Sequence, residues 1–216
     1  MTCAVLLALC RFSAMSEICS IFATWFPLGG SSTAPGGCFT LEPKGFQNGF
    51  SSLNNHIMAE FKTNVMRILD KEKIDYKAFE YPHGKEAVDG LTVARLLDED
   101  PKCVFKTLVT QGASGGYFVF VVPVECELDL KKCAKSVGEK SVEMIHVKDI
   151  TKVTGYVRGG CSPLGMKKQY VTTFHQTARD IDTIMVSAGR IGYQIALAPS
   201  DLVALAGGQY ADIVRE

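Results

Sequence analysis

Short runs of β-branched and aromatic residues recur from residue 58 to the end of the chain, and the connections between them restrict the fold most. Residues 102–110 and 117–124 are two such runs, and the six residues between them, Gln-Gly-Ala-Ser-Gly-Gly, are typical of a hairpin turn. Parallel strands need a crossover connection of about a dozen residues or more. Connections this short therefore predict a mixed or antiparallel sheet.

Amphipathic segments alternate with these strands. Val65, Ile68 and Leu69 recur at helical spacing, while Gly138 suits the end of one helix and Ser200 the start of another. Further helices are expected over 85–100, 128–138, 148–154 and 200–208, and strands over 74–81, 141–147, 169–174, 182–189, 193–199 and 210–214. The alternation predicts an α+β domain, with a mixed, barrel-like β-sheet and helices packed outside it.

Residues 1–57 differ from the rest of the chain. They hold two basic and two acidic residues, a stretch rich in Gly and Ser at 29–37, and no sustained period of 2 or 3.6. We interpret them as an irregular N-terminal extension, followed by one domain over 58–216. Three origins stay open for the extension: coding sequence misassigned upstream of a true start at Met58, a targeting segment, or a functional arm.

The bulk composition excludes several classes of function. The 23 basic and 23 acidic residues balance, which argues against a protein that grips nucleic acid by bulk charge alone. No apolar run reaches the ~18 residues that a membrane span needs, and nucleotide-binding glycine motifs do not occur. None of the eight cysteines stands two to four residues from another, which favours free thiols in a reducing compartment over a zinc site. We therefore expect no cofactor and no metal.

A glycine-rich loop at 155–168, Gly-Tyr-Val-Arg-Gly-Gly-Cys-Ser-Pro-Leu-Gly-Met-Lys-Lys, ends on two lysines. The paired Gly159 and Gly160 allow positive φ and a close approach of the backbone to a ligand. Consecutive N–H groups can bind a carboxylate, a phosphate or a developing oxyanion, and Lys167 and Lys168 are suited to phosphates. On spacing alone, a plain turn beside two solvated lysines is the favoured interpretation, because glycine-rich turns are common.

Lys106 interrupts the apolar run at 102–110, where an unpaired charge would be costly. It either points outward from the polar side of the strand or lies at the floor of a cleft. In the second case it would hold a phosphate or a carbonyl oxygen, and Thr107 beside it would offer a hydroxyl group.

Five stretches of the chain occur together, and in this order, in one protein family. Residues 105–109, 128–144, 154–168, 183–192 and 210–214 resemble the YbaK-type Cys-tRNA(Pro) deacylases, and the resemblance runs from about Phe61 to the C-terminus. It implies an α+β fold around a mixed, barrel-like sheet, related to an editing insertion of prolyl-tRNA synthetases. It also implies removal of cysteine wrongly attached to proline tRNA, because a binding pocket gains only about 1–3 kcal/mol from a methylene-sized difference.

The resemblance implies a set of site residues. These are Lys106, Gly159 and Gly160 as catalytic groups, and Tyr81, Thr107, Ser187 and Gln194 as substrate-binding groups. His83 also matches a histidine of the family. Gln194 is a departure, because many members carry an aspartate there. It can form hydrogen bonds but cannot act as a base, which leaves room for a changed amino-acid preference.

The implied mechanism needs little acid–base machinery. The substrate's own thiol attacks its ester carbonyl and releases the tRNA as a cyclic thioester forms, while the protein positions the groups and stabilises the oxyanion. The Gly159 and Gly160 amides would contact the carbonyl oxygen, and Lys106 the terminal ribose-phosphate. Cys161 is an alternative nucleophile, although we expect it to be a small apolar filler. As bases, His83 and His175 lack a visible partner.

The expected partners are aminoacylated tRNA(Pro) and prolyl-tRNA synthetase, on which a domain of near-zero net charge would depend for tRNA contacts. The expected location is the cytoplasm, without contact to DNA or a membrane. Two alternatives stay open: a hydrolytic deacylase for another small residue, such as Ala-tRNA(Pro), and a non-catalytic module that binds tRNA or a synthetase. An enzyme, unlike a binding module, should turn over many substrate molecules at substoichiometric protein. Cleavage that depends on the substrate thiol indicates the lyase-like reaction, and cleavage that does not indicates hydrolysis.

Overall fold

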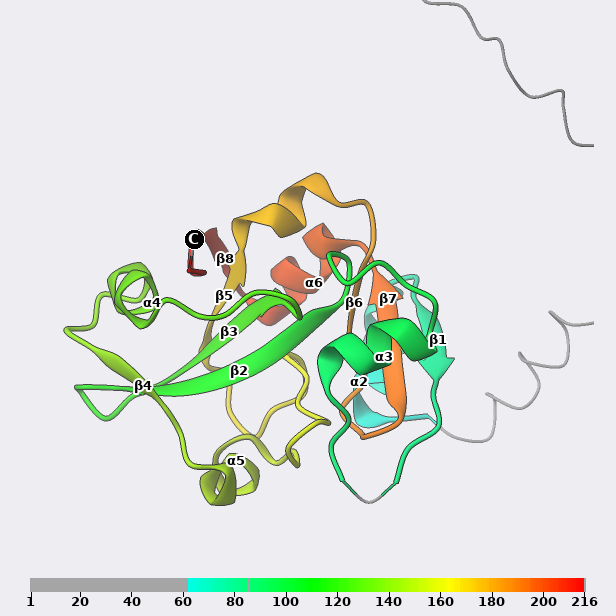
Figure 1. Cartoon of the computed structure of the whole chain (residues 1–216), viewed down its shortest axis with the longest axis horizontal. Helices are drawn as coiled ribbons and strands as arrows, with labels where there is room; N and C mark the ends of the chain where they lie inside the picture. Colours follow the sequence, from blue (N-terminus) through cyan, green and yellow to red (C-terminus); the bar gives the residue numbers. More distant parts are fainter. Residues whose placement is uncertain (1–61, 85, 216) are drawn as a thin grey trace, which may run out of the picture. The chain divides into compact units, whose positions relative to one another are not determined.

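The expected hairpin lies within the larger of two β-sheets (Figure 1). Its strands, β2 (Phe105–Gly112) and β3 (Tyr117–Pro123), pair in antiparallel orientation. The structure is a computed structural model that describes residues 62–84 and 86–215, so the expectations for residues 1–57 lie outside the described residues.

Five strands form the larger sheet, in the order β4-β2-β3-β5-β8. Strand β4 (Val142–Met144) pairs antiparallel with β2. On the other side of the hairpin, β5 (Val171–His175) and β8 (Gln209–Ala211) continue the sheet in parallel from β3. The sheet is therefore mixed, as the connection lengths predict.

The remaining strands form a separate antiparallel sheet, in the order β1 (Lys77–Glu80), β7 (Tyr193–Leu197) and β6 (Ile184–Ser187). A single parallel bridge, between Val104 and Met185, connects the start of β2 to β6. The α+β class with a mixed sheet is confirmed. However, the described strands do not close into a barrel, because closure requires a continuous ladder and one bridge does not provide it.

Five α-helices lie within the described residues, and each overlaps a segment that the sequence predicts to be helical. They are α2 (Asn64–Glu72), α3 (Gly90–Leu96), α4 (Leu130–Ser136), α5 (Val147–Thr154) and α6 (Pro199–Ala206), accompanied by one 3-10 helix, η1 (Gln176–Asp180). Gly138 follows α4 with φ of +72°, as predicted, but Ala198 rather than Ser200 caps α6. Pro199 begins that helix, since its fixed φ and missing N–H suit a first turn. Among the described residues, no helix has the length and apolar character required to cross a membrane.

The main core lies between the two sheets. Val109 and Val121 from the larger sheet meet Val186 and Ile195 from the smaller one, and Leu69 of α2 packs against them. A second cluster lies on the opposite face of β2 and β3 and includes residues of α4. A third cluster joins α3 to both sheets and contains Ala94, Val104, Val124, Met185 and Ala196.

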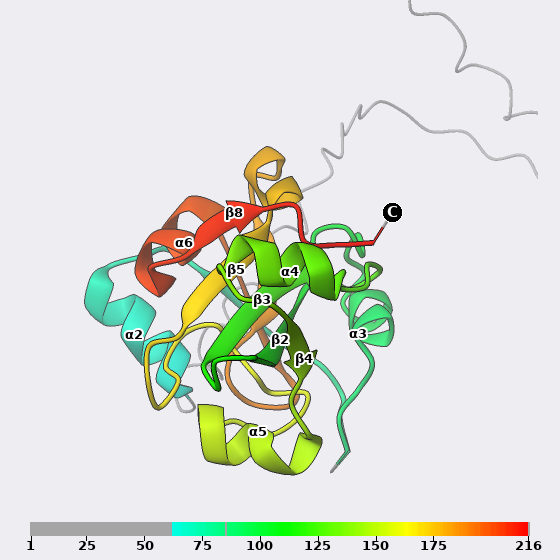
Figure 2. The same cartoon turned by 90° about the vertical axis from the view of Figure 1, so that its left-hand side faces the viewer.

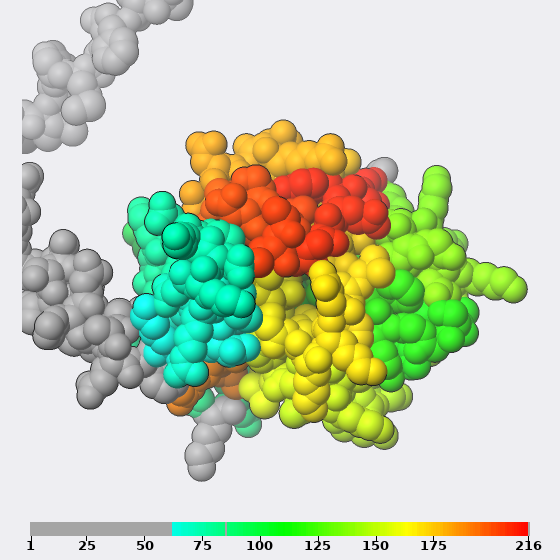
Figure 3. Space-filling model, turned by 180° about the vertical axis from the view of Figure 1, so that it is seen from behind, coloured from blue at the N-terminus to red at the C-terminus, as the bar shows by residue number. Residues whose placement is uncertain are grey.

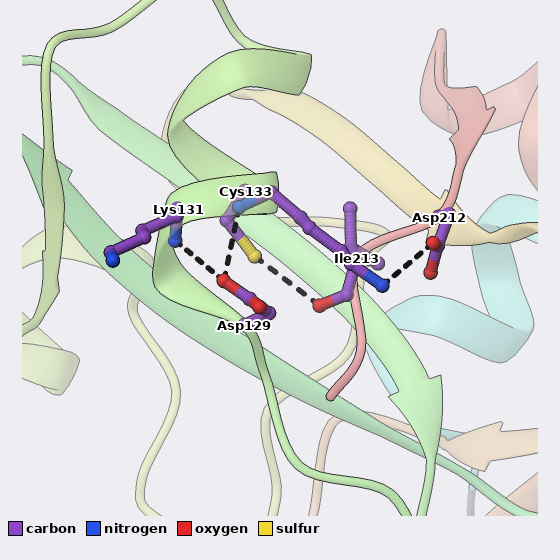
Figure 4. Close-up of polar contacts among 6 residues, drawn as sticks. Asp129, Lys131, Cys133, Asp212 and Ile213 are labelled. Atoms are coloured by element: carbon purple, nitrogen blue, oxygen red, sulfur yellow. Dashed lines mark hydrogen bonds and ion pairs between the residues drawn. The ribbon is translucent and has the colours of Figure 1, made fainter. Parts of the chain in front are cut away.

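Polar contacts hold α4 against the C-terminal segment (Figure 4). Asp129 caps the helix by accepting two backbone N–H groups of the first turn, at 2.8 and 3.1 Å. Lys132 Nζ forms an ion pair with Asp212 at 2.8 Å, and Cys133 Sγ donates to the Ile213 carbonyl at 3.6 Å. The last residues of the fold are therefore fixed to α4 rather than free to leave the sheet (Figure 2 shows the helix over β8 and β5).

Candidate active site

A short hairpin places two polar side chains opposite each other. Ser187 at the end of β6 pairs with Gln194 in β7, and both are more than nine-tenths buried. The turn between them closes through the Ala188 N–H, which donates to the Tyr193 carbonyl at 3.1 Å. Because directly opposed residues of antiparallel strands project from the same face, Ser187 and Gln194 form a small polar patch at this end of the sheet.

Tyr81 and His83 follow β1 and close one side of the hairpin turn. Tyr81 is buried, and its N–H donates to the Gly192 carbonyl at 2.9 Å. The His83 ring lies edge-on to the rings of Tyr81 and Tyr193, with 6.3 Å between ring centroids in each pair. A Cβ atom at residue 192 would lie 2.1 Å from His83 Nδ1. His83 therefore packs over a glycine, and this contact fixes the segment that carries Tyr81.

The glycine-rich loop begins and ends at the C-terminal end of α5. The Lys167 N–H donates to the Thr154 carbonyl at 3.0 Å, and Lys167 Nζ donates to the Thr151 carbonyl at 3.1 Å. Thr151 Oγ1 in turn donates to the Tyr156 carbonyl at 3.0 Å. These contacts close the base of the loop at 155–168, so that its middle is held in one place.

Gly159 and Gly160 bring the middle of the loop against two other segments. A Cβ atom at residue 159, where φ is +82°, would lie 2.5 Å from the Ala87 Cβ, and one at residue 160 would lie 3.0 Å from the Ile191 nitrogen. Side chains here would push the loop away from the hairpin turn. The Gly160 N–H donates to the Val157 carbonyl at 3.0 Å, so the loop already uses one of the two amides expected to bind a carbonyl oxygen. The Gly159 N–H has no acceptor among the described residues.

Lys106 lies on the same face of its strand as Val104, which forms the parallel bridge to Met185 of β6. Lys106 and Ser187 each stand two residues beyond a residue of this bridge, so each shares a strand face with its bridge residue. The Lys106 side chain is half-buried, and its Nζ donates to the Val124 carbonyl at 3.1 Å. An ammonium group has three donors, so two remain for a ligand after this bond.

Thr107 lies on the other face of β2, because successive strand residues alternate between faces. Phe105 and Val109, which share its face, belong to the main core between the sheets. Thr107 Oγ1 is buried and has no hydrogen-bond partner among the described residues. The structure therefore does not bring the Thr107 hydroxyl together with the Lys106 ammonium group, although the sequence led us to expect both in one pocket.

Gln194 has an unsatisfied acceptor inside the site. Its Oε1 atom is buried and receives no hydrogen bond from the described residues. A buried acceptor without a donor costs about 1–3 kcal/mol, and a donor from a bound molecule would remove this cost. The Oγ1 of Thr110 and the Nδ1 of His175 are also unsatisfied, but they belong to strands of the larger sheet. Among these residues with an unsatisfied buried side-chain atom, Gln194 is the one that lies opposite Ser187.

The cysteine of the loop does not have the properties of a nucleophile. Burial raises the pKa of the Cys161 thiol to about 12, so the thiol stays protonated at neutral pH, whereas attack requires the thiolate. This agrees with the expected role as a small apolar filler. The cysteines among the described residues are free thiols, as the sequence predicts: Cys103, Cys126, Cys133 and Cys161.

His175 is not part of this site. It lies in β5, between β3 and β8 of the larger sheet. Burial lowers its pKa, partly opposed by the charge of Asp212. The structure therefore separates this histidine from the polar patch of Ser187 and Gln194, and a base role there is not supported.

The sequence did not predict which residues contact the paired glycines. Ala87 and Ile191 contact them from segments that are distant along the chain, and neither residue type carries a functional signal. Gly192 could have been found, because a glycine between two strand patterns often marks a turn with positive φ, and here φ is +88°.

A surface hollow of about 200 Å³ lies beside the end of the loop and α6 (Figure 3), and Gln194 is not among the residues that line it. Lys168 lines this hollow, whereas Lys167 Nζ is bound by backbone carbonyls of α5 at 3.1 and 3.3 Å. The two adjacent lysines are therefore not equivalent, and they do not act together as a pair beside Gly159 and Gly160.

Known proteins share both the sequence pattern and the fold. Residues 85–205 match the family described as the aminoacyl-tRNA editing domain. A protein of Enterococcus faecalis (strain ATCC 700802 / V583), named as the candidate Cys-tRNA(Pro)/Cys-tRNA(Cys) deacylase EbsC, is 47% identical over 155 residues, which are 72% of this chain and 94% of that protein.

Solved structures resemble this fold at lower identity. A candidate trans-editing enzyme for prolyl tRNA synthetase is 21% identical, with a TM-score of 0.62 over 72% of this chain and 99% of the other. The hypothetical protein APE2540 is 19% identical, with a TM-score of 0.64 over 71% of this chain and 100% of the other. The matched pattern covers more than half of the 216 residues, and the Enterococcus relative is matched over almost its whole length. The chain therefore belongs to the aminoacyl-tRNA editing domain family.

Proposed function

We propose that this chain is a trans-editing deacylase that removes cysteine wrongly attached to tRNA(Pro), and that it also accepts Cys-tRNA(Cys). The observation that carries the proposal is the 47% identity, over 94% of its length, to the Enterococcus relative whose name gives these two substrates. Membership in the editing-domain family supports the same class of reaction, which is cleavage of an aminoacyl ester.

In this proposal the site works by position rather than by acid–base groups. The Gly159 N–H, which lacks an acceptor among the described residues, donates to the ester carbonyl oxygen as negative charge develops on it. Lys106 binds the terminal ribose-phosphate with the two donors that its bond to Val124 leaves over. Gly160 holds the loop in shape through its bond to the Val157 carbonyl.

Three buried residues form the proposed amino-acid pocket: Tyr81, Ser187 and Gln194. The unsatisfied Gln194 Oε1 is suited to accept an N–H from the substrate's ammonium group. A neutral amide binds an ammonium group less strongly than a carboxylate does, so shape contributes more to selectivity here. Thr107 is a positioning residue in this scheme, because its side chain supports β2 from the core side.

The attacking group belongs to the substrate. Its thiolate sulfur forms a bond to its own carbonyl carbon, the ester C–O bond to the ribose breaks, and the ribose oxygen takes up the proton that the thiol has lost. The products are tRNA with a free terminal hydroxyl and a cyclic thioester, which water then opens in solution. A protein nucleophile is not needed, which agrees with the pKa of about 12 for Cys161.

We further propose that residues 58–216 constitute the editing domain, and that prolyl-tRNA synthetase assists its tRNA binding in the cytoplasm. The physical reason is the balance of 23 basic and 23 acidic residues, which limits affinity for RNA by bulk charge. The resemblance to a solved trans-editing protein supports the fold that such an assembly would use.

Blocking the substrate thiol tests the proposal. The full chain, at a concentration far below that of the substrate, should release cysteine repeatedly from Cys-tRNA(Pro). It should not release S-methylcysteine from the corresponding tRNA, because a methylated sulfur cannot attack the carbonyl. Equal release of both amino acids would instead indicate attack by water, and release of neither would favour a binding module.

A further inference from the structure

A group of cations lies on α5 and on the glycine-rich loop that follows it. Within residues 146–168 there are five basic residues and one acidic residue, Asp149, although the whole chain is balanced. We call the five basic residues the α5 basic surface; all are exposed, and they are Lys148, Lys152, Arg158, Lys167 and Lys168.

The charge of this surface is not neutralised by carboxylates of the described residues, whose ion pairs lie elsewhere in the fold. Lys148 and Lys152 are four residues apart in α5, so they share one face of the helix. The Lys167 Nζ, bound to the Thr151 and Lys152 carbonyls at 3.1 and 3.3 Å, adds its charge at the C-terminal end of the same helix. Three cations therefore lie on α5 and at its C-terminal end, with Asp149 in the first turn as the acidic residue of the helix.

This group of cations is connected directly to the candidate active site. The loop at 155–168 starts and ends at α5, while Gly159 and Gly160 in its middle approach Ala87 and Ile191. An RNA whose aminoacylated 3′ end lies at Gly159 therefore finds the α5 cations at the base of the same loop. Helix α5 lies at the edge of the fold, where a large partner has access (Figures 1 and 2).

We propose that the α5 basic surface binds the phosphate backbone of the tRNA acceptor stem. This inference rests on the proposed function and adds the surface that holds the body of the RNA. Charge complementarity carries it, since Lys and Arg contacts to phosphates supply most of the sequence-independent affinity for nucleic acids. A protein partner is the competing occupant, because Val147 and Val157 are 54% and 50% exposed near these cations.

The double variant Lys148→Gln/Lys152→Gln in the full chain tests the surface. Its kcat and KM are measured with Cys-tRNA(Pro) and with 3′-cysteinyl-adenosine, which has the same ester but no phosphate backbone. We expect KM for the tRNA to rise at least about tenfold at low salt, with kcat unchanged and the small ester cleaved as before. The slope of log(kcat/KM) against log salt should become shallower by about 2, because each lost phosphate contact removes about 0.9.

Lys131→Gln/Lys135→Gln in α4 is the matched control. These lysines are also exposed and four residues apart, and α4 lies apart from α5 in both views (Figures 1 and 2). The control should keep the wild-type KM and salt slope. The proposal is overturned if both pairs behave alike, if the α5 pair changes neither quantity, or if cleavage of the small ester falls equally. A loss seen only with prolyl-tRNA synthetase present would also overturn it, in favour of a protein-docking surface.

The failure of this inference can be distinguished from failure of the proposed function. If the wild-type chain cleaves no substrate, the proposed function is wrong, but binding of uncharged tRNA(Pro) still tests the surface. In a filter-binding assay, weaker binding by the α5 pair alone supports the proposal, and equal binding by both variants and the wild type overturns it.

Discussion

Lys106 combines one structural hydrogen bond with donors that the fold leaves unused. The bond from its Nζ to the Val124 carbonyl fixes the ammonium group before a substrate arrives. A cation held in place loses little freedom when it binds a phosphate, so it can position the substrate at a small entropic cost. A half-buried ammonium group with unused donors is compatible with the role in the site that the sequence resemblance implies.

Replacing Lys106 with Ala tests this role. We expect kcat/KM for Cys-tRNA(Pro) to fall at least about tenfold, since hydrogen bonds between charged groups, such as those to the ribose-phosphate, contribute about 1.5–3 kcal/mol. Unfolding free energy should change by only about 1 kcal/mol, because one hydrogen bond is lost. Lys102→Ala, which removes a nearby exposed lysine, should keep full activity. Full activity in Lys106→Ala would remove this residue from the mechanism.

The Gln194 side chain is expected to lower the stability of the fold while it contributes to activity. Gln194→Met removes the unsatisfied Oε1 while keeping a similar volume, so urea denaturation should give an unfolding free energy unchanged or about 1 kcal/mol higher. The kcat/KM for Cys-tRNA(Pro) should fall about tenfold or more, as for a lost hydrogen bond to a charged group. Thr107→Val removes a similar buried atom on the core side of β2 and should keep most activity. Wild-type activity in Gln194→Met would contradict the pocket assignment.

His175 should make stability depend on pH. Burial lowers its pKa in the folded state, whereas the unfolded residue binds a proton near pH 6.5. Below that pH the unfolded state therefore holds more protons, and the free energy of unfolding decreases by at most about 1.4 kcal/mol per pH unit. The pKa of Asp212 is lowered by its bond to Lys132. Protonation of Asp212 therefore decreases the free energy of unfolding only below about pH 4. Urea denaturation of His175→Gln should show a flatter profile from pH 6.5 to 5, and an unchanged profile would contradict this account.

At the scale of elements, the glycine-rich loop requires a glycine at residue 159 because the backbone there lies close to Ala87, and not only because φ is positive. Gly159 and Gly115 have similar φ values, +82° and +85°, but only residue 159 faces a neighbour, the Ala87 Cβ, at 2.5 Å. Alanine at either position costs about 1–2 kcal/mol in backbone strain. Gly159→Ala should therefore lose both stability and at least about tenfold in kcat/KM, whereas Gly115→Ala should lose stability alone. Equal activities of the two variants would show that the loop position does not matter.

The elements also show what the sequence can and cannot predict. The β2–β3 hairpin and the helices could be predicted, because turn composition and apolar spacing are local properties. The division into two sheets could not be predicted. It is decided by which strands pair across long stretches of chain, and Val104 and Met185, whose bridge links the two sheets, are distant along the chain. The expectation that Thr107 and Lys106 act together could have been avoided, because strand alternation is local and places these neighbours on opposite faces. The engaged Gly160 amide follows from the turn geometry, which composition does not specify.

At the scale of the whole molecule, charge is neutral in total but uneven in distribution. The chain has 23 basic and 23 acidic residues, yet the α5 basic surface stands beside the loop that reaches the site. We expect a protein built in this way to bind RNA weakly overall and to orient it locally through this surface. This arrangement agrees with an editing enzyme that must not compete with translation for every correctly charged tRNA.

The release of amino acids from three substrates tests the central claim most directly. The full chain and the fragment of residues 58–216 are incubated, far below the substrate concentration, with Cys-tRNA(Pro), Ala-tRNA(Pro) and Pro-tRNA(Pro). We predict repeated and selective release of cysteine by both proteins, at similar rates. Release of alanine or proline at a comparable rate, or no release from any substrate even with prolyl-tRNA synthetase added, would contradict the account.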